Sequence, residues 1–522
     1  MRVLVTGATG FIGRALIPLL QRDGHSVVAW VRSEARGRSL LGAEVELVPA
    51  DAGFDVLVCA IERCDAVVNL AGEPLMGGRW TAARRAILED SRVKVTDLLV
   101  RAIAAARTRP AVLISGSAVG YYGGCAEEHL TEASTAGDDF LARLCRKWED
   151  AAQPAEMLGL RVVRLRTGVV LGRAGGVLAQ MLPPFEFGLG GPVGSGKQYL
   201  PWIHLLDLVK IIAAALVDDR YRGPVNGVAP EQATNRSFAR ALGRALHRPA
   251  ILPLPALALK AIVGQAATVL LASQRVDPLA LRERQFACDF PTLAAALEDI
   301  VSGAAVTISP AQSRPEGAGE ARYELRARTV VDAPLAETFA FFSKAANLGL
   351  ITPAAMKFSI QGQVPPMAKG ATIDYRVRVG PLPVQWRTRI TKWEPGRSFI
   401  DLQEAGPYRL WWHEHTFHAD GERTVMEDRV FYAPPLGILG RLANRLFIGP
   451  TLRKIFQYRG DVIRLRFGVV ASARIPGAER FEGDAKRRRA FRLGQAEPSP
   501  NIPQSRSALG HRPRRCHQSA AG

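Results

Sequence analysis

Cysteines, acidic residues and long hydrophobic runs are scarce in this chain of 522 residues, and each scarcity argues against a class of protein. The six cysteines include no Cys-x-x-Cys pair and no dense spacing, which argues against a disulfide scaffold and fits free thiols in a reducing cytoplasm. Residues 251–272 are apolar, but prolines, a glycine and a lysine interrupt them, so we expect a packed helix and no membrane span. The chain opens on a predicted strand, so we expect no signal peptide and a cytoplasmic protein.

The charge balance is strongly basic. The chain has 49 acidic residues against 68 lysines and arginines, a formal net charge of +19. No recognised nucleic-acid motif accompanies this charge, so it favours a small anionic ligand, such as a phosphorylated cofactor, over nucleic acid. The chain is too long for one hydrophobic core, and we expect two or three domains.

A glycine-rich turn lies near the start of the chain. Residues 3–5 predict a buried strand, and residues 11–17 predict an amphipathic helix. Three glycines follow the predicted strand at intervals of three residues. Gly7 suits a tight bend, Gly10 the approach of a pyrophosphate, and Gly13 close packing of the helix on the strand. The helix N-terminus would offer free N–H groups to the phosphates. We therefore predict a dinucleotide site formed by Thr6, Gly7, Thr9, Gly10, Phe11, Ile12 and Gly13.

An acidic residue is missing where one would bind the ribose 2′-hydroxyl, at the end of the strand predicted over 26–32. Arg32 stands there instead. A cation suits a 2′-phosphate, so NADP(H) is favoured over NAD(H). The alternative is an ordinary solvated arginine at a strand end.

Strands and helices alternate along the next 130 residues. Strands are expected at 45–48, 66–72, 111–117 and 160–166, and helices at 89–106 and 140–157. This alternation predicts an α/β Rossmann fold with a doubly wound parallel sheet. Small or hydroxylated residues at the carboxyl ends of two strands let a cofactor pass close by. They extend the predicted cofactor site to Leu70, Ala71, Gly72 and Ser115.

Residues 1–300 resemble the extended and atypical short-chain dehydrogenase/reductases. Within that superfamily they are most similar to NAD(P)-dependent epimerase-like oxidoreductases of bacteria and mitochondria. The resemblance implies a cofactor-binding domain whose residues 173–300 cover a small carbonyl or alcohol substrate. The segments that carry it are 6–13, 69–74, 90–93, 115–123, 166–172 and 202–207, with an extension near 250–300.

The superfamily's Tyr-x-x-x-Lys pair is absent. Aligned on Glu149, Leu141 and Cys145 occupy the two positions, and Lys147 lies about 200° round the helix from the expected lysine. Arg92 likewise stands where the superfamily has asparagine. Ser117 matches the catalytic serine.

A carbonyl that accepts a hydride also needs a proton donor. Tyr121 or Tyr122 could supply the proton, and the alternative is that both tyrosines only line the pocket. The resemblance makes Ser117 and Tyr121 the candidate catalytic residues. The candidate substrate contacts are Glu73, Tyr122, Trp202 and His204, although His204 could equally be a hydrogen-bonded structural residue.

Two functions remain open for this part of the chain. The first is an NADP(H)-dependent oxidoreductase or epimerase that acts on a small, apolar carbonyl or alcohol. The second is an NADP(H)-responsive binding or regulatory protein that has lost the tyrosine–lysine chemistry.

The remaining sequence divides into three parts. Gly, Pro and Ser punctuate residues 301–321, which we read as a linker. Residues 322–468 alternate polar and apolar positions in several strands, of which the first is expected at 323–331. A short helix is expected near 334–342, and a long one over 437–464 with a break near Gly449. This stretch resembles the START-like (SRPBCC) helix-grip proteins of the polyketide-cyclase-like branch, which implies an apolar ligand. The basic residues 469–522 are expected to be a disordered, solvated tail, with an anionic partner as the alternative.

His413 and His415 lie two apart on a predicted strand and therefore face the same side. Such a pair could bind a metal, but no third ligand lies nearby in the sequence, so a pair of polar residues on a sheet face is expected and no metal site is predicted.

Overall fold

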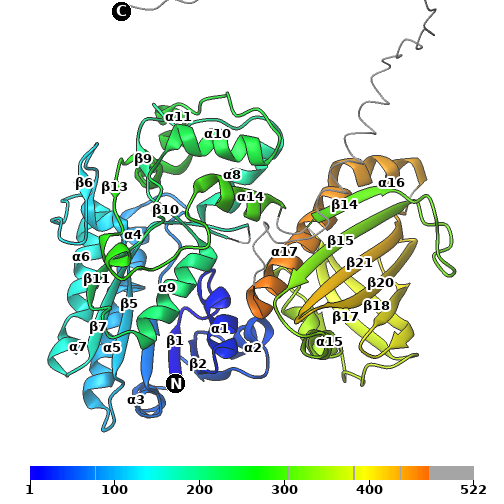
Figure 1. Cartoon of the computed structure of the whole chain (residues 1–522), viewed down its shortest axis with the longest axis horizontal. Coiled ribbons are helices and arrows are strands. Elements are labelled where there is room, and N and C mark those ends of the chain that lie inside the picture. Colours follow the sequence, from blue (N-terminus) through cyan, green and yellow to red (C-terminus); the bar gives the residue numbers. More distant parts are fainter. Residues whose placement is uncertain (77, 174, 303–304, 380–381, 436, 469–522) are drawn as a thin grey trace, which may run out of the picture. The chain divides into compact units, whose positions relative to one another are not determined.

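The computed structural model describes residues 1–468 except 77, 174, 303–304, 380–381 and 436 (Figure 1). The predicted basic tail at 469–522 lies outside the described residues. Among the described helices, none combines the length and apolar character that crossing a membrane requires. The apolar stretch at 251–272 forms only short helices, α11 (Ala256–Val263) and α12 (Thr268–Leu271), joined by a 3-10 turn.

A parallel sheet of seven strands forms the centre of the first 300 residues, in the order β11-β7-β5-β4-β1-β2-β3. Every neighbouring pair in it is parallel. The order reverses beside β1, and in such sheets a ligand binds at the carboxyl edge next to this reversal. The predicted α/β Rossmann fold is thereby confirmed. The strands are β1 (Arg2–Thr6), β2 (Ser26–Val31), β3 (Glu46–Pro49), β4 (Ala66–Asn69), β5 (Val112–Ala118), β7 (Arg161–Thr167) and β11 (Gly223–Gly227).

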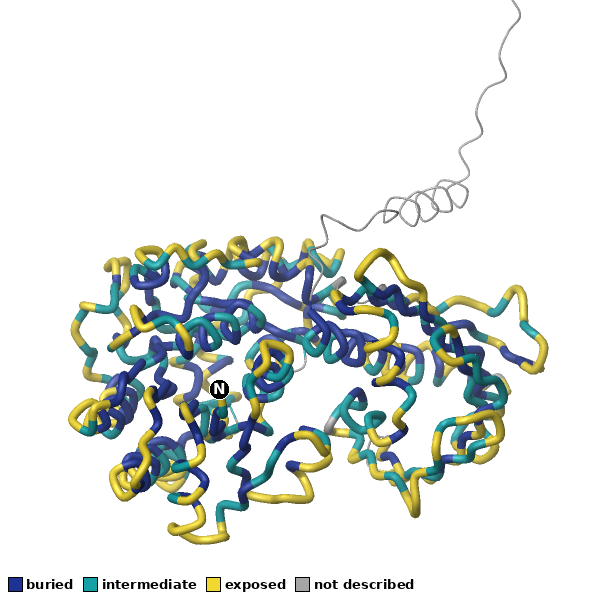
Figure 2. The backbone as a smooth tube through the Cα atoms, turned by 60° about the horizontal axis from the view of Figure 1, so that its bottom comes forward, coloured by how far each residue is buried: buried dark blue, intermediate teal, exposed yellow. Residues whose placement is uncertain are grey.

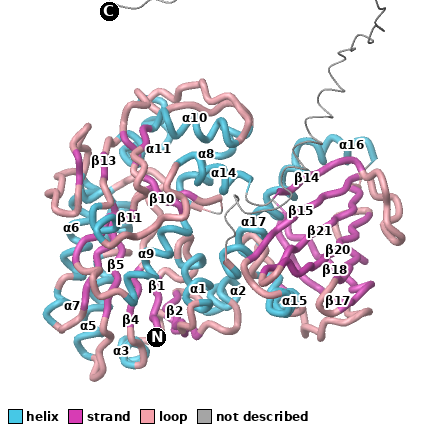
Figure 3. The backbone as a smooth tube through the Cα atoms, in the orientation of Figure 1, coloured by secondary structure: helices cyan, strands magenta, loops and turns pink. Residues whose placement is uncertain are grey.

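Helices cover both faces of this sheet, and Figure 3 shows the strands between them. Side chains alternate along β1, so Val3 and Val5 join a core with α1 and α9, whereas Leu4 joins another with α3 and α5. Figure 2 shows that buried segments of the backbone lie inside and that exposed segments lie at the outside. The helices are α1 (Gly13–Arg22), α2 (Glu34–Leu41), α3 (Phe54–Glu62), α4 (Ala82–Asp90), α5 (Val93–Ala105), α6 (Phe140–Ala152), α7 (Pro154–Met157) and α9 (Leu205–Val217).

Two predicted helices are each divided in the structure. The helix expected over 89–106 is α4 followed by α5, separated at residues 91–92, where the Ser91 hydroxyl donates to the Leu88 carbonyl. The helix expected over 140–157 ends at Ala152, and α7 begins at Pro154, because proline cannot donate the hydrogen bond that a continuous helix requires.

Short elements complete this region above the carboxyl edge. They are β6 (His129–Leu130), β8 (Val169–Leu171), α8 (Gly176–Glu186), β9 (Tyr199–Leu200), β10 (Trp202–His204), β12 (Ala233–Thr234), α10 (Asn235–Ala245), β13 (Arg275–Val276), α13 (Leu279–Glu283) and α14 (Leu293–Ser302).

An antiparallel sheet of eight strands forms the second region, in the order β14-β15-β21-β20-β19-β18-β17-β16. The predicted strand at 323–331 has the same bounds in the structure. The strands are β14 (Ala305–Pro310), β15 (Tyr323–Val331), β16 (Ser359–Ile360), β17 (Thr372–Val379), β18 (Leu382–Glu394), β19 (Ser398–Ala405), β20 (Leu410–Asp420) and β21 (Arg423–Ala433).

Part of the expected linker at 301–321 is a strand of this sheet. β14 pairs with β15 in antiparallel register, with Val306 opposite Ala327 and Ile308 opposite Leu325. Only two apolar residues, Val306 and Ile308, alternate in β14, and prolines and glycines follow them. The sequence therefore predicted a linker where the structure has a strand.

Three helices accompany the second sheet: α15 (Leu335–Phe342), α16 (Gly437–Ala443) and α17 (Gly449–Phe467). A π-helical segment at 444–448 joins the last two, at the break expected near Gly449. Phe339 of α15 and Ile463 of α17 share a core with Phe399 and Phe417 of the sheet. The predicted antiparallel sheet with packed helices is thus confirmed, whereas the helix-grip fold itself stays a prediction.

Candidate functional site

The glycine loop follows β1 at the carboxyl edge of the parallel sheet. Gly7 has a φ of +65°, a backbone conformation that favours glycine. The Gly10 N–H donates to the Gly7 carbonyl oxygen at 2.8 Å and closes the turn. A Cβ on Gly7 would lie 2.5 Å from the Leu70 carbonyl oxygen, and one on Gly13 would lie 2.5 Å from the Gly7 oxygen. The loop therefore packs so closely against β4 and α1 that only glycine fits at either position.

Hydroxyl contacts and ring packing fix the two sides of this loop. The Thr6 hydroxyl donates to Asn69 Oδ1 at 2.7 Å and accepts from Ala71 N at 3.2 Å, which joins the ends of β1 and β4. The Phe11 ring fills the space above Gly172 and Gly175, where an added Cβ would lie within 2.7 Å of it. The predicted loop residues thus gather at one edge, and Thr9 and Ile12 lie in the same turn before α1.

Arg32 directly follows β2 at the same edge. Its side chain is 90% exposed, and its nearest carboxylate oxygen, Glu73 Oε2, lies 3.9 Å from its Nη1. Glu73 is also bound by Arg84, at 3.2 Å, so two cations share this carboxylate. The Arg32 guanidinium thus shares its carboxylate with Arg84 and stays mostly exposed, so an anionic group can approach it at this edge.

A buried polar network lies beside the end of β5. Arg166 donates to both oxygens of Glu149, at 2.8 and 2.9 Å, and the Ser117 hydroxyl donates to Glu149 Oε1 at 2.7 Å. Burial lowers the pKa of Arg166, but the hydrogen bonds and charge of Glu149 outweigh this effect and raise it. Arg166 also donates to the Tyr122 hydroxyl, which in turn donates to Asn226 Oδ1. We call these five residues the β5 network.

The two predicted tyrosines differ in their surroundings. Tyr122 is fully buried in the β5 network, and burial raises its pKa to about 12 although Arg166 and Asn226 lower it. Tyr121 is only partly buried, and the Arg166 guanidinium carbon lies 3.5 Å from its ring centroid. Tyr121 is therefore the better placed of the two to reach a ligand.

Comparisons with known proteins agree with this arrangement. The family model described as "NAD dependent epimerase/dehydratase family" matches residues 3–226, and a domain of unknown function (DUF1731) matches residues 254–300. The epimerase family protein SDR39U1 of Bos taurus is 43% identical over 308 residues, which are 58% of this chain and all of that protein. This chain belongs to the NAD dependent epimerase/dehydratase family.

Two further family relatives support the assignment. The chloroplastic SDR39U1 homolog of Arabidopsis thaliana is 40% identical over 58% of this chain and 87% of its own length. A crystal structure of human epimerase family protein SDR39U1 with NADPH is 41% identical, with a TM-score of 0.53, and covers 58% of this chain and 99% of that one.

Leu141 and Cys145, at the two positions of the superfamily's tyrosine–lysine pair, pack against the loop after β5. An added Cβ on Gly120 would lie 3.3 Å from Leu141 Cβ and 3.7 Å from Cys145 Sγ, so both side chains press against the loop after β5. Cys145 is buried, and burial raises the pKa of its thiol to about 12. The Lys147 ammonium donates to Glu89 at 2.7 Å, so it is occupied elsewhere.

Arg92, which stands at the position expected for the superfamily's asparagine, contacts the backbone of two neighbouring segments. Its guanidinium donates to the carbonyls of Leu88 and Glu73, and it lies over the Trp148 ring at 5.3 Å. A Cβ on Gly72 would lie 3.2 Å from this guanidinium. Arg92 therefore braces the predicted cofactor segment at 70–72 from below.

Trp202 and His204 lie in the core. Trp202 packs with Leu171 and Phe238, and His204 stacks on Phe290 with ring centroids 4.0 Å apart. His204 Nδ1 accepts from Leu206 N at 3.2 Å, which caps α9. These positions favour the structural role of His204 over a substrate contact.

A second candidate site lies in the antiparallel sheet, where a cavity of about 850 Å³ is lined chiefly by residues of β17–β20, α15 and the C-terminal helices. Its walls are mostly apolar and aromatic, and they include Ile373, Tyr375, Trp386 and Trp411. The sequence resemblance implied an apolar ligand for this region, and the sequence analysis recognised His413 and His415, which lie in the wall. Asp401 was missed because it meets the histidines only through strand pairing.

Buried charges concentrate at one point of this wall. Burial would raise the pKa of Asp428, but Arg459 and the adjacent histidines hold it well below its ordinary value. Burial likewise opposes ionisation of Asp401, and His413 and His415 outweigh it and lower its pKa. The apolar cavity thus has one buried carboxylate in its wall, Asp401, and a second, Asp428, against the two histidines of that wall.

Proposed function

We propose that the family domain at 1–300 is an NADP(H)-dependent oxidoreductase or epimerase acting on a small carbonyl or alcohol. The observation that carries this proposal is the pairing of the closely packed glycine loop with an exposed Arg32 at the same edge of the sheet. The structure of the human relative with NADPH supports the choice of cofactor. The cytoplasmic location remains a prediction from the number and spacing of the cysteines.

The chain's own residues would hold the cofactor in a definite order. The loop from Thr6 to Gly13 receives the pyrophosphate, because its glycines admit close backbone approach and α1 directs its positive end there. Arg32 would pair with the 2′-phosphate. The segment at 70–72 and Ser115 would complete the cofactor site. When bound, NADPH supplies the hydride.

Proton transfer in this proposal falls to Tyr121. The Tyr122 hydroxyl already donates to Asn226, and the Ser117 hydroxyl already donates to Glu149, so neither offers a free proton. Arg166 stacks on Tyr121 and fixes its ring, which makes Arg166 a positioning residue. The phenol of Tyr121 would protonate the carbonyl oxygen as the hydride arrives.

A specific observation favours the non-catalytic alternative. Leu141 and Cys145 replace the tyrosine–lysine pair, and both are packed against Gly120. A domain so arranged would bind NADP(H) and respond to it without turnover. The catalytic function requires Tyr121 as a proton donor, and the non-catalytic function does not.

The test is NADPH oxidation over a panel of aldehydes and ketones with wild-type protein and Tyr121→Phe. Loss of a positioned acid lowers turnover by about 10²–10⁴-fold, so we expect kcat to fall by at least 100-fold while NADPH affinity is unchanged. Leu252→Ala, an exposed residue of the same domain, is the matched control and should retain full turnover. Tight NADPH binding with no turnover by the wild type across the panel would establish the non-catalytic function.

We propose further that residues 322–468 form a helix-grip domain that binds an apolar ligand in the 850 Å³ cavity. The volume lies in the range of small-molecule pockets, and the wall is mostly apolar. An environment-sensitive apolar dye should bind the wild-type protein. Ile373→Trp should weaken that binding by filling the cavity, whereas Val217→Trp, an exposed position on α9, should leave it unchanged.

A further inference from the structure

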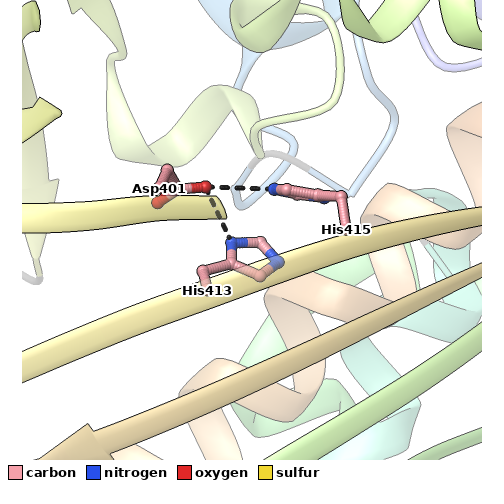
Figure 4. Close-up of side chains that lie close together, drawn as sticks. All are labelled: Asp401, His413 and His415. Atoms are coloured by element: carbon pink, nitrogen blue, oxygen red, sulfur yellow. Dashed lines mark hydrogen bonds and ion pairs between the residues drawn. The ribbon is translucent and has the colours of Figure 1, made fainter. Parts of the chain in front are cut away.

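Two histidines and one aspartate converge in the wall of the cavity (Figure 4). His413 and His415 lie two apart on β20 and face the same side, and Asp401 on β19 is the register partner of His413. Asp401 Oδ2 lies 3.3 Å from His413 Nδ1 and 3.0 Å from His415 Nε2. These three atoms lie within 4.8 Å of one another, and both histidines are buried.

A second carboxylate holds the same two histidines from their opposite ring nitrogens. Asp428 on β21 places Oδ1 3.1 Å from His413 Nε2 and 2.7 Å from His415 Nδ1. Arg459 on α17 reaches the same oxygen at 3.3 Å, and its Nη2 also lies 3.1 Å from His415 Nδ1. Each imidazole therefore lies between two carboxylates.

One contact of this cluster lacks a donor when both imidazoles are neutral. Arg459 Nη2 lies 3.1 Å from His415 Nδ1, so the proton of His415 is then on Nε2 and donates to Asp401, while His413 Nε2 donates to Asp428. His413 Nδ1 and Asp401 Oδ2 are left as two acceptors 3.3 Å apart. A cation bound by these two atoms and His415 Nε2 removes the cost of that contact.

The spacing of these three atoms fits such a cation. Metal bonds of about 2.0–2.2 Å to nitrogen and oxygen place neighbouring ligand atoms roughly 2.9–3.5 Å apart. The separations of Asp401 Oδ2 from the two histidine nitrogens, 3.0 and 3.3 Å, fall within that range. Histidine ligands that donate their other N–H to a carboxylate are the usual arrangement in metal sites, and Asp428 is placed for that role.

We propose that His413 Nδ1, His415 Nε2 and the Asp401 carboxylate bind a divalent transition-metal ion of the Zn²⁺ or Fe²⁺ class in the wall of the cavity. Two imidazoles and one carboxylate suit these ions and leave coordination positions open. Because the three ligands line the cavity, the open positions face it. An apolar molecule with a carbonyl or hydroxyl oxygen is then the chemical class that the cavity would take. This site is independent of the proposed NADP(H) chemistry.

The test is metal binding by the full chain, stripped with chelator and titrated with Zn²⁺ and with Co²⁺. We expect one tightly bound ion per chain, with visible Co²⁺ absorption bands from mixed nitrogen and oxygen ligands. His413→Gln and Asp401→Asn should each weaken binding by at least tenfold. His418→Ala is the matched control, because His418 is an exposed histidine of the same strand and should leave binding unchanged.

Two results would overturn the proposal. The first is the absence of stoichiometric binding to the folded wild-type protein, in which case a proton bridges the cluster. The second is binding that His418→Ala removes and His413→Gln does not. Because a variant could fail to fold, X-ray absorption of the metal-loaded wild type provides an independent measurement. A first shell with two histidine nitrogens is expected, and a shell of sulfur or of oxygen alone would contradict the assignment.

Discussion

The β5 network of the first region and the histidine–aspartate cluster of the second are both buried and charged, but they differ in how their protons are matched. In the β5 network the Ser117 and Tyr122 hydroxyls and the Arg166 guanidinium each donate to a fitting acceptor. In the cluster, His413 Nδ1 and Asp401 Oδ2 lie 3.3 Å apart, and with neutral imidazoles this contact has no donor. A network with a donor for every acceptor favours a fixed fold, and the contact without a donor is where we propose a metal ion.

The largest expected effect comes from breaking the matched network. Glu149→Gln keeps the shape but leaves Arg166, 4% exposed, without its anion. Removing one partner of a buried ion pair costs about 3–5 kcal/mol, so we expect a loss of that size in the free energy of unfolding. Urea unfolding measured by circular dichroism provides the value.

The control for Glu149→Gln is an exposed ion pair of the same domain. Asp97→Asn removes the carboxylate that binds Arg101 on α5, where both side chains are more than half exposed. Exposed pairs contribute about 0–1 kcal/mol, so this variant should unfold almost like the wild type. Equal effects of the two substitutions would show that the β5 network does not hold the fold.

A smaller effect is expected in the glycine loop. Gly13→Ala places a Cβ 2.5 Å from the Gly7 oxygen and 2.7 Å from Ala8 Cα, both backbone atoms that cannot move aside cheaply. Such overpacking costs about 1–3 kcal/mol and should also weaken NADPH binding. Gly124→Ala is the matched control, since its Cβ would meet nothing within 4 Å. Unchanged stability and NADPH affinity in Gly13→Ala would contradict the close packing of the loop.

The smallest effect is expected at Lys147. Its ammonium is bound to Glu89 on an exposed surface, so Lys147→Ala should change stability by no more than about 1 kcal/mol and leave NADPH affinity as it is. Calorimetric titration of the wild type and of the variant with NADPH measures the change in affinity. A tenfold loss of affinity would show that Lys147 reaches the cofactor and substitutes for the missing lysine after all.

Local patterns in the sequence predicted much of the fold. Residues 3–13 combine a strand, glycines at fixed spacing and a helix within eleven positions, and the structure contains each of them. The strand at 323–331 was predicted with its exact bounds because its apolar alternation is sustained. β14 was missed because its alternation is short and its pairing with β15 is not local.

The sites were harder to predict because their residues meet across strands. Glu149 served in the sequence only to align the helix, yet it joins Ser117 of β5 to Arg166 of β7. The histidine pair was recognised from its spacing of two, but Asp401 is twelve residues earlier and reaches His413 only through the register of β19 and β20. A register of this kind follows from the whole sheet and cannot be read from one strand.

The most direct test of the central claim is the affinity of the full chain for NADPH and NADH, measured by fluorescence titration in wild type, Arg32→Ala and the exposed control Arg101→Ala. We predict a preference for NADPH in the wild type and in Arg101→Ala, and loss of that preference in Arg32→Ala because the 2′-phosphate loses its cation. Failure of the wild type to bind either nucleotide would contradict the account of the first domain.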